Sequence, residues 1–230
     1  MFRVVTYNIR AGLGLDGIQS IRRIAQTLAP LNADVVCLQE VDQHVPRSWL
    51  ANQPKYLSTR LGMQAVFQKN LSIGRGGFGN CVLVKPAALH CRHHPLPGTG
   101  EPRGVLEVTA SLDGYEVGVF CTHLDIDRQE RVEQAKTVRE IVHAASDPKI
   151  LCGDMNDVPG SPTLSALLDE AVLRDTALEI DGGSVYTLSD GTPRRIDFVL
   201  ADFAFAVKDY ELIDSPASDH RPVVVDLEAA

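Results

Sequence analysis

The sequence predicts a single α/β (α+β) domain over residues 1–230, in which two β-sheets pack face to face and helices cover the outside. Three observations indicate this fold. Short apolar runs typical of strands outnumber the segments with helical periodicity. The helical segments lie between strands at two well-separated places, as expected for two roughly similar halves. A chain of 230 residues also suits one hydrophobic core.

The elements of the first half follow from apolar runs and the residues that interrupt them. Residues 2–8 read as a buried strand, and 18–28 have a helical period, with Asp16 or Gly17 as cap and Pro30 beyond the end. Residues 34–40 are too continuously apolar for a strand with one face in water. The remaining expectations are a loop with a helical turn over 41–60, a strand over 64–68, a flexible glycine-rich turn over 74–80 and a strand over 81–84.

The second half begins as an antiparallel meander. Strands are expected over 89–93, 104–111 and 115–123, with Asp113-Gly114 as a hairpin turn. A long amphipathic helix over 128–145 leads to a strand over 149–153. Ser161 as N-cap and Pro162 at the first helical position open a helix over 163–170. Three strands complete the chain, over 195–200, 205–211 and 222–227.

Composition and charge limit the partners and the compartment. The net charge of −8 and the lack of a basic run make nucleic acid a possible but not a favoured partner. No apolar segment suggests a signal peptide or a membrane span. The five cysteines lack metal-ligand spacing, and four lie in apolar runs, which predicts buried free thiols in a reducing cytoplasm.

Several apolar runs stop abruptly at a polar residue, most clearly Ile150-Leu151-Cys152-Gly153-Asp154-Met155-Asn156-Asp157. Taken singly, these polar residues have ordinary roles: an Asp after Gly caps a turn or a helix, and an Asn at a strand end makes a turn. Oxygen ligands with two imidazoles suit a hard divalent cation and a phosphate ester. If the strand ends converge, one acidic pocket forms from Asn8, Glu40, His123, Asp154, Asn156, Asp197, Asp219 and His220.

An ordered set of short motifs across the chain resembles the endonuclease/exonuclease/phosphatase superfamily. The resemblance spans residues 6 to 223 and implies a four-layer sandwich of two mixed β-sheets with helices outside. The motifs are Thr6-Tyr7-Asn8-Ile9-Arg10, Leu38-Gln39-Glu40-Val41-Asp42, Gly79-Asn80, Thr122-His123-Leu124, Gly153-Asp154-Met155-Asn156, Arg195-Ile196-Asp197-Phe198 and Ser218-Asp219-His220-Arg221-Pro222-Val223.

The resemblance also implies roles for the pocket residues. Glu40 is similar to the principal Mg²⁺ or Mn²⁺ ligand of the family, assisted by Asn8 and Asp219. Asp154 resembles the aspartate that orients or deprotonates the attacking water, and Asn156 the residue that holds a phosphate oxygen.

The two histidines of the pocket receive separate roles. His220 resembles the family histidine that contacts the scissile phosphate, and Asp197 behind it fixes the tautomer. His123 stands where sphingomyelinase-like members carry histidine and abasic-site endonucleases carry tyrosine, which disfavours DNA-repair specificity. Asn80 and Arg103 are expected to reach the substrate, although a surface salt bridge is an equal alternative for Arg103.

We therefore predict a divalent-metal-dependent phosphoesterase. It hydrolyses a phosphodiester or phosphomonoester of a small or lipid-derived substrate by attack of a metal-activated water. The alternatives are a nuclease of the abasic-endonuclease or exonuclease type, and a non-catalytic scaffold that retains the fold. The residues leave open the substrate, the choice between Mg²⁺ and Mn²⁺, one metal or two, and the oligomeric state. Substrate choice is expected to lie in loops 42–60, 68–80 and 180–194.

Overall fold

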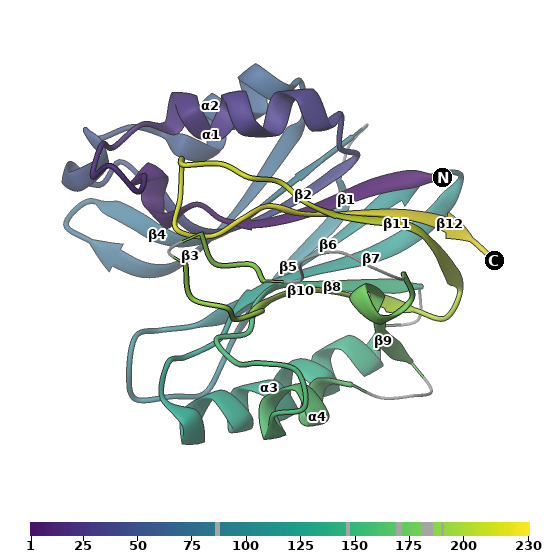
Figure 1. The fold of residues 1–230 in the computed structure, drawn as a ribbon. Helices are drawn as coiled ribbons and strands as arrows, with labels where there is room; N and C mark the ends of the chain where they lie inside the picture. The colour runs from purple at the N-terminus through teal and green to yellow at the C-terminus, as the bar shows by residue number, and fades with distance from the viewer. Residues whose placement is uncertain (86–87, 146–147, 169–171, 181–185, 190) are drawn as a thin grey trace.

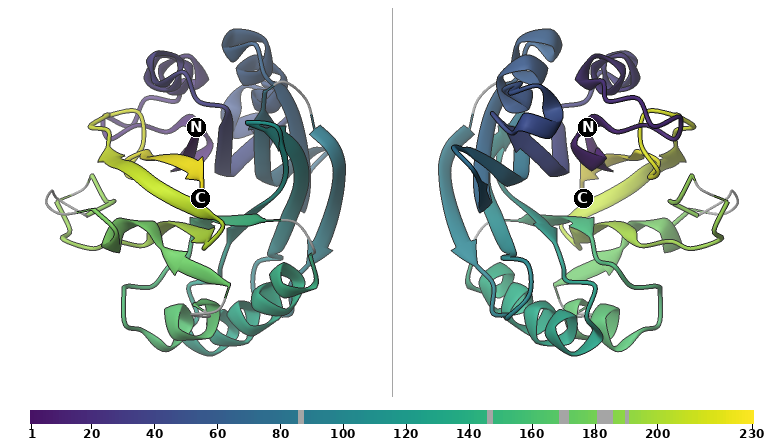
Figure 2. Two further views of the ribbon diagram at one scale, coloured as in Figure 1. Left: turned by 90° about the vertical axis from the view of Figure 1, so that its right-hand side faces the viewer. Right: turned by 90° about the vertical axis from the view of Figure 1, so that its left-hand side faces the viewer.

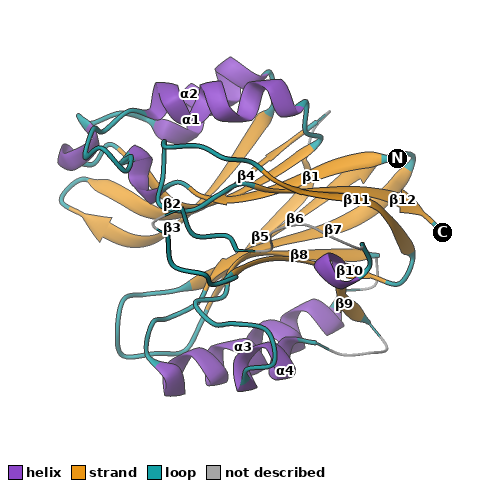
Figure 3. Ribbon diagram, viewed as in Figure 1, coloured by secondary structure: helices purple, strands orange, loops and turns teal. Residues whose placement is uncertain are grey.

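Two β-sheets packed face to face, with helices on both outer surfaces, form the four layers of the protein (Figures 1 and 3). The computed structural model describes residues 1–85, 88–145, 148–168, 172–180, 186–189 and 191–230. Helices α1 (Ile21–Leu28) and α2 (Gln53–Leu61) cover one sheet, and α3 (Arg128–Ala144) and α4 (Pro162–Leu167) cover the other. The predicted sandwich is confirmed.

The first sheet has the strand order β11-β12-β1-β2-β4-β3. Its β1 and β2 are parallel and the other neighbours are antiparallel, so the sheet is mixed. Its strands are β1 (Phe2–Asn8), β2 (Val35–Gln43), β3 (Gln64–Ile73), β4 (Gly76–Val84), β11 (Phe205–Leu212) and β12 (Val223–Ala229).

The second sheet repeats this arrangement with the order β5-β6-β7-β8-β10-β9. Here β7 and β8 are the parallel pair among antiparallel neighbours. Its strands are β5 (Ala88–Pro95), β6 (Gly104–Leu112), β7 (Tyr115–His123), β8 (Lys149–Asp154), β9 (Leu173–Asp175) and β10 (Asp197–Asp202).

Three apolar clusters hold the layers together. The cluster between the sheets is formed by alternate residues of both inner faces, such as Val4 and Val119. On the outside, Ile24 of α1 packs on the first sheet and Val138 of α3 on the second. All five cysteines are free and only Cys91 is exposed, as the sequence predicted for the thiols. No helix in the described part of the chain is long and apolar enough to cross a lipid bilayer.

Long-range contacts corrected several expected boundaries in the first half. Helix α1 starts at Ile21 with Ser20 as N-cap, because the preceding backbone is already paired: Leu13 bridges Gln19, and the Ser20 N–H donates to the carbonyl of Gly12. The region 41–60 contains the full helix α2, with a side-chain cap from Asn52.

Residues 74 and 75 of the glycine-rich segment form the turn between β3 and β4, whereas the rest of the segment belongs to a buried strand and not to a flexible turn. Residues 76–84 form β4, all of them buried between β2 and β3. Glycine is required there because a Cβ atom on Gly79 would overlap the carbonyl oxygen of Gln68 on the neighbouring strand. In the second half, α4 ends at Leu167, before the predicted end; residues 169 and 170 of that prediction, and part of loop 180–194, lie outside the described residues.

The topology brings the ends of two pairs of parallel strands, one pair from each sheet, to one edge of the sandwich. Strands β1 and β2 finish there in the first sheet, and β7 and β8 finish there in the second, with His123 in register with Asp154. Strand β10 starts at the same edge, since Asp197 pairs with Asp154. Both chain termini lie at the opposite end of the molecule (Figures 1 and 2).

Replacing Gly153 by alanine tests the close approach of β7 and β8 that aligns this edge. A Cβ atom there would overlap the carbonyl oxygen of Thr122, a backbone atom that cannot move without shifting β7. We expect Gly153→Ala to lower the free energy of unfolding by about 2 kcal/mol or more, as measured by urea denaturation. Gly118→Ala in β7 is the control: its Cβ meets the ring of Phe120, which can shift, so we expect a loss below about 1 kcal/mol. Equal losses in the two variants would contradict this account.

Candidate active site

The amide of Asn8 joins carboxylates from the two sheets. Asn8 ends β1, and its Nδ2 donates to Glu40 Oε1 and to Asp154 Oδ2, both at 3.0 Å. Its Oδ1 accepts the backbone N–H of Arg10 at 3.0 Å, which fixes the orientation of the amide. Asn8 is 1% exposed, so this bridge lies inside the sandwich edge.

A β-bulge directs Glu40 into the same space. The pairing of β2 with β4 shifts register between Leu38 and Val41, and Glu40 has a left-handed φ of 56°. Bulges of this kind re-aim a side chain next to an active site. Burial raises the pKa of Glu40, and the negative charge of Asp154 adds to this shift, while the hydrogen bond from Asn8 opposes it.

Asp154 is the centre of the site. It is 2% exposed, and its Oδ1 accepts the backbone N–H of Asn156 at 2.9 Å. Its Oδ2 lies 3.5 Å from His123 Nε2 and 3.7 Å from His220 Nε2, in addition to the contact with Asn8. One carboxylate is therefore surrounded by residues of both sheets and of the loop before β12.

His220 is held by a carboxylate behind it, as the sequence predicted. Its Nδ1 donates to Asp197, 2.8 Å from Oδ2 and 3.1 Å from Oδ1, and Asp197 is fully buried. Burial alone would lower the pKa of His220, but the charge of Asp197 and the hydrogen bond to it raise that pKa to about 10. His220 is thus a cation at neutral pH, with Nε2–H facing Asp154.

His123, in contrast, is neutral. Burial lowers its pKa to about 4, assisted by the positive charge of Arg103 and opposed by Asp154. The Asn156 amide donates to the carbonyl of Leu124 at 2.8 Å, so the same Nδ2 also donates to His123 Nε2 at 3.1 Å. Nε2 is then an acceptor and the ring proton is on Nδ1.

Asp219 lies at the rim and is partly exposed. Its Oδ2 is 3.1 Å from Nη1 of Arg10, and its Oδ1 accepts from the hydroxyl of Ser218 at 3.3 Å. The Ser218 hydroxyl also donates to the carbonyl of Asn8 at 2.7 Å, which ties the loop before β12 to the end of β1.

Two regions of the site offer ligands for a cation. Among the described residues, ligand atoms of Asp154, Asp197 and His220 lie within 4.8 Å of one another. In that group, Nδ1 of His220 and Asp197 are already hydrogen-bonded to each other. The second region has only carboxylates: the charges of Asp154 and Asp219 raise the pKa of Glu40, so the three groups lie near one another, although their ligand atoms do not form a second group within 4.8 Å.

The two expected substrate contacts lie at different depths. Asn80 is buried, and its Nδ2 donates to the carbonyls of Gly104 at 2.9 Å and Cys121 at 3.4 Å, which joins β4 to the second sheet. The Arg103 guanidinium is 3.1 Å from Glu101 Oε1, and its buried Nε has no hydrogen-bond partner. Arg103 thus lies near the site, and its Nε–H group can still donate a hydrogen bond.

Two neighbours of the site received no role from the sequence. Arg10 lies in the first motif and pairs with Asp219, and the motif itself was the available signal. Arg47 binds Asp42 with two hydrogen bonds and stacks over the ring of Phe78 at 4.7 Å. The charge of Glu40 contributes to the raised pKa of Arg47, which therefore lies near the carboxylates.

Comparisons with known proteins agree with this geometry. Over 163 residues, the chain is 32% identical to tyrosyl-DNA phosphodiesterase 2 of Rattus norvegicus, a match that covers 66% of this chain and 40% of that protein. The chain thus spans about two fifths of the length of that relative.

Solved structures show the same fold. An endonuclease/exonuclease/phosphatase from Beutenbergia cavernae has a TM-score of 0.83 and 27% identity, covering 100% of this chain and 72% of that one. A mannosyl-6-phosphatase from Bacteroides thetaiotaomicron has a TM-score of 0.77 and 21% identity, covering 99% and 100%. Residues 5–220 match the Endonuclease/Exonuclease/phosphatase family. The chain therefore belongs to this family, which confirms the family predicted from its motifs.

Proposed function

We propose that residues 1–230 form one catalytic domain that hydrolyses a phosphodiester or phosphomonoester of a small or lipid-derived substrate with a divalent metal. The observation that carries this proposal is the surroundings of Asp154. A buried carboxylate lies between one neutral and one cationic histidine and is bridged by an amide to a second carboxylate. Such an arrangement can take a proton from water on one side and stabilise phosphoryl oxygen charge on the other.

Asp154 is the proposed base for the attacking water. Its Oδ1 is oriented by the N–H of Asn156, and its Oδ2 faces the interior of the site. His220, as a cation, donates from Nε2 toward the phosphoryl group while Asp197 holds its other nitrogen. His123 stays neutral beside the amide of Asn156, and a contact between that amide and a phosphate oxygen requires it to release His123 or Leu124, because both of its N–H groups are engaged.

A divalent cation fits the oxygen donors of Glu40, Asp219 and Asn8. Carboxylate and amide oxygens are hard ligands that suit Mg²⁺ or Mn²⁺, and a cation offsets the crowding that raises the pKa of Glu40. Coordination by Asn8 requires its amide to turn, since the nitrogen now faces the carboxylates. When bound, the ion neutralises charge on the phosphoryl oxygens.

Substrate binding is assigned to Arg103 and Asn80 in this proposal. The Nε of Arg103 lies 3.9 Å from Asp125 Oδ2 but makes no hydrogen bond, which supports a contact between this guanidinium and a phosphate oxygen. Asn80 supports the pocket mainly through its bridge between the sheets. We also propose a reducing cytoplasm as the location, which the five free cysteines support.

A nucleic-acid phosphodiester is the second candidate substrate. The relative from Rattus norvegicus is named for tyrosyl-DNA, and the loop after β2 carries Trp49, which is 85% exposed, next to the stacked guanidinium of Arg47. Exposed aromatic faces and guanidinium groups suit the bases and phosphates of a single strand. Hydrolysis of a phosphotyrosyl-ended DNA strand in preference to bis-p-nitrophenyl phosphate would favour this candidate. A non-catalytic scaffold is disfavoured because it has no need of so many buried carboxylates.

Removing the base or the cationic histidine tests the chemistry directly. We expect Asp154→Asn and His220→Ala to lower kcat on bis-p-nitrophenyl phosphate by about 10²- to 10⁴-fold, the usual contribution of a positioned acid or base. Circular dichroism of each variant should match the wild type. Full activity in a folded Asp154→Asn protein would refute the assigned base.

Metal removal tests the oxygen-donor side. We expect EDTA to abolish hydrolysis and Mg²⁺ or Mn²⁺ to restore it, whereas Glu40→Gln should need a higher metal concentration for the same rate. The readouts are the initial rate and the binding isotherm of Mn²⁺. Undiminished rates in EDTA would rule out the metal-dependent reaction.

The pairing of His220 with Asp197 predicts a pH-dependent stability in metal-free protein. The folded pKa of about 10 lies above the ordinary value of 6.5, so the stabilisation is complete below about pH 6.5 and is lost as pH rises through about 10. The difference in unfolding free energy between wild type and Asp197→Asn should therefore be largest near about pH 6 and shrink toward about pH 10. Urea denaturation at several pH values measures it, and a difference independent of pH would contradict the assignment.

A further inference from the structure

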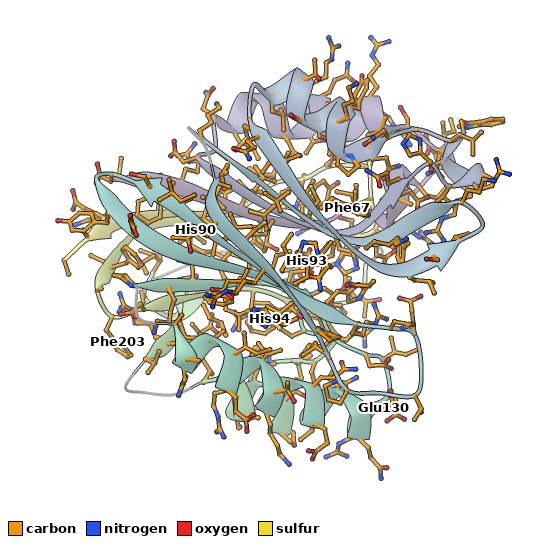
Figure 4. The ribbon with its side chains drawn as sticks, turned by 180° about the vertical axis from the view of Figure 1, so that it is seen from behind. Phe67, His90, His93, His94, Glu130 and Phe203 are labelled. Atoms are coloured by element: carbon orange, nitrogen blue, oxygen red, sulfur yellow. The ribbon has the colours of Figure 1, made fainter. Side chains whose placement is uncertain are left out.

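The first two turns of α3 carry polar side chains directed at the loops of the catalytic edge. Glu130 accepts from the N–H groups of Thr99 and Gly100, in the loop between β5 and β6. Figure 4 shows that loop reaching Glu130. Gln134 accepts from the N–H of Asp125 at 2.8 Å and donates to the carbonyl of Pro97 at 3.0 Å.

Arg131, between these two residues, joins two further loops with one guanidinium group. Its Nη1 donates to the carbonyls of Asp125 at 3.1 Å and Ile126 at 2.8 Å, in the loop after β7. Its Nε and Nη2 each lie 3.3 Å from Asp157 Oδ2, in the loop after β8. The side chain is 10% exposed, so the charge is largely removed from water and depends on these partners.

The two loops joined by Arg131 follow directly on His123, the last residue of β7, and on Asp154, the last residue of β8. His123 lies two residues before Asp125, and Asn156 directly precedes Asp157. Asn156 has a left-handed φ of 50°, and its amide contacts His123 across the gap between the loops. The same Oδ2 of Asp157 also accepts the Thr163 hydroxyl at 2.8 Å, and its Oδ1 accepts the backbone N–H of Val158 at 3.0 Å.

We propose that Arg131 is a positioning residue that holds these loops in the relative position required for the contact between Asn156 and His123. A planar guanidinium can donate to carbonyls on one side and to a carboxylate on the other at fixed angles, which a lysine ammonium on a flexible stem cannot reproduce. Arg131 acts through the loops and touches neither substrate nor metal. The kinetic part of this inference rests on the proposed function.

The test compares Arg131→Lys, Arg131→Met and Asp157→Asn with Arg139→Met, a change at an exposed arginine on the same helix. The first readout is the NMR shift of His123 Nε2 without metal or substrate, which reports its hydrogen bond to Asn156. The second is the steady-state kinetics of bis-p-nitrophenyl phosphate hydrolysis with Mg²⁺. Thermal melting monitored by circular dichroism shows whether each variant is folded.

In the three test variants we expect a changed shift of His123 Nε2 and a kcat lowered by about 10- to 100-fold with little change in KM, because small misplacements strongly reduce rate. The Asp157→Asn change should add little in the Arg131→Met background, since both remove the same brace. Arg139→Met should leave both readouts unchanged.

An Arg131→Lys protein with wild-type melting, kcat and His123 shift would overturn the proposal. If Arg131→Met does not fold, Arg131→Lys and Asp157→Asn decide the outcome by the same criteria. Absence of hydrolysis by the wild type would instead contradict the proposed function. The His123 shift would then still decide whether Arg131 positions the loops.

Discussion

The site depends on keeping several negative groups close together between two sheets. Glu40 and Asp154 lie close enough to share one amide group, so their carboxylates repel one another, and burial strengthens the repulsion. Asn8 makes the arrangement possible, because its two N–H groups satisfy Glu40 and Asp154 at once while its oxygen is fixed by the backbone. The cationic His220 offsets part of the remaining charge.

The two histidines show how the same residue type acquires different states within one site. Both lie within 4 Å of Asp154, yet only His220 has a second carboxylate behind it. Nε2 of His123, the nitrogen nearest Asp154, instead accepts from the amide of Asn156, and the charge of Arg103 lies nearby. The difference lies in these partners, which come from β10 in one case and from the loop after β8 in the other.

Strand ends were the most informative feature of the sequence, and the reason is physical. An apolar run that stops at Asn8 or Asp154 marks both a buried strand and the edge of the sheet where that strand ends. Because the strands on either side pair in parallel, their polar end residues meet at one edge. The motif resemblance supplied the roles. The left-handed bulge at Glu40 and the burial of the segment around Gly79 escaped prediction, because each depends on a neighbouring strand distant in sequence. The predicted start of α1 was wrong for a local reason, because the residues directly before Ile21 pair with one another, as in the bridge between Leu13 and Gln19.

The division of the site between two sheets also has a consequence for how the protein loses activity. Asn8 and Glu40 belong to one sheet, and His123, Asp154 and Asp197 belong to the other. The contacts between the two groups lie at the edge of the sandwich, and the sheets behind them are held together by an apolar interior. A solvent or temperature that weakens the packing of this interior would let the two groups of site residues separate, while the hydrogen bonds between the strands of each sheet remain. Enzymatic activity is therefore an early reporter of sheet separation, ahead of the loss of secondary structure.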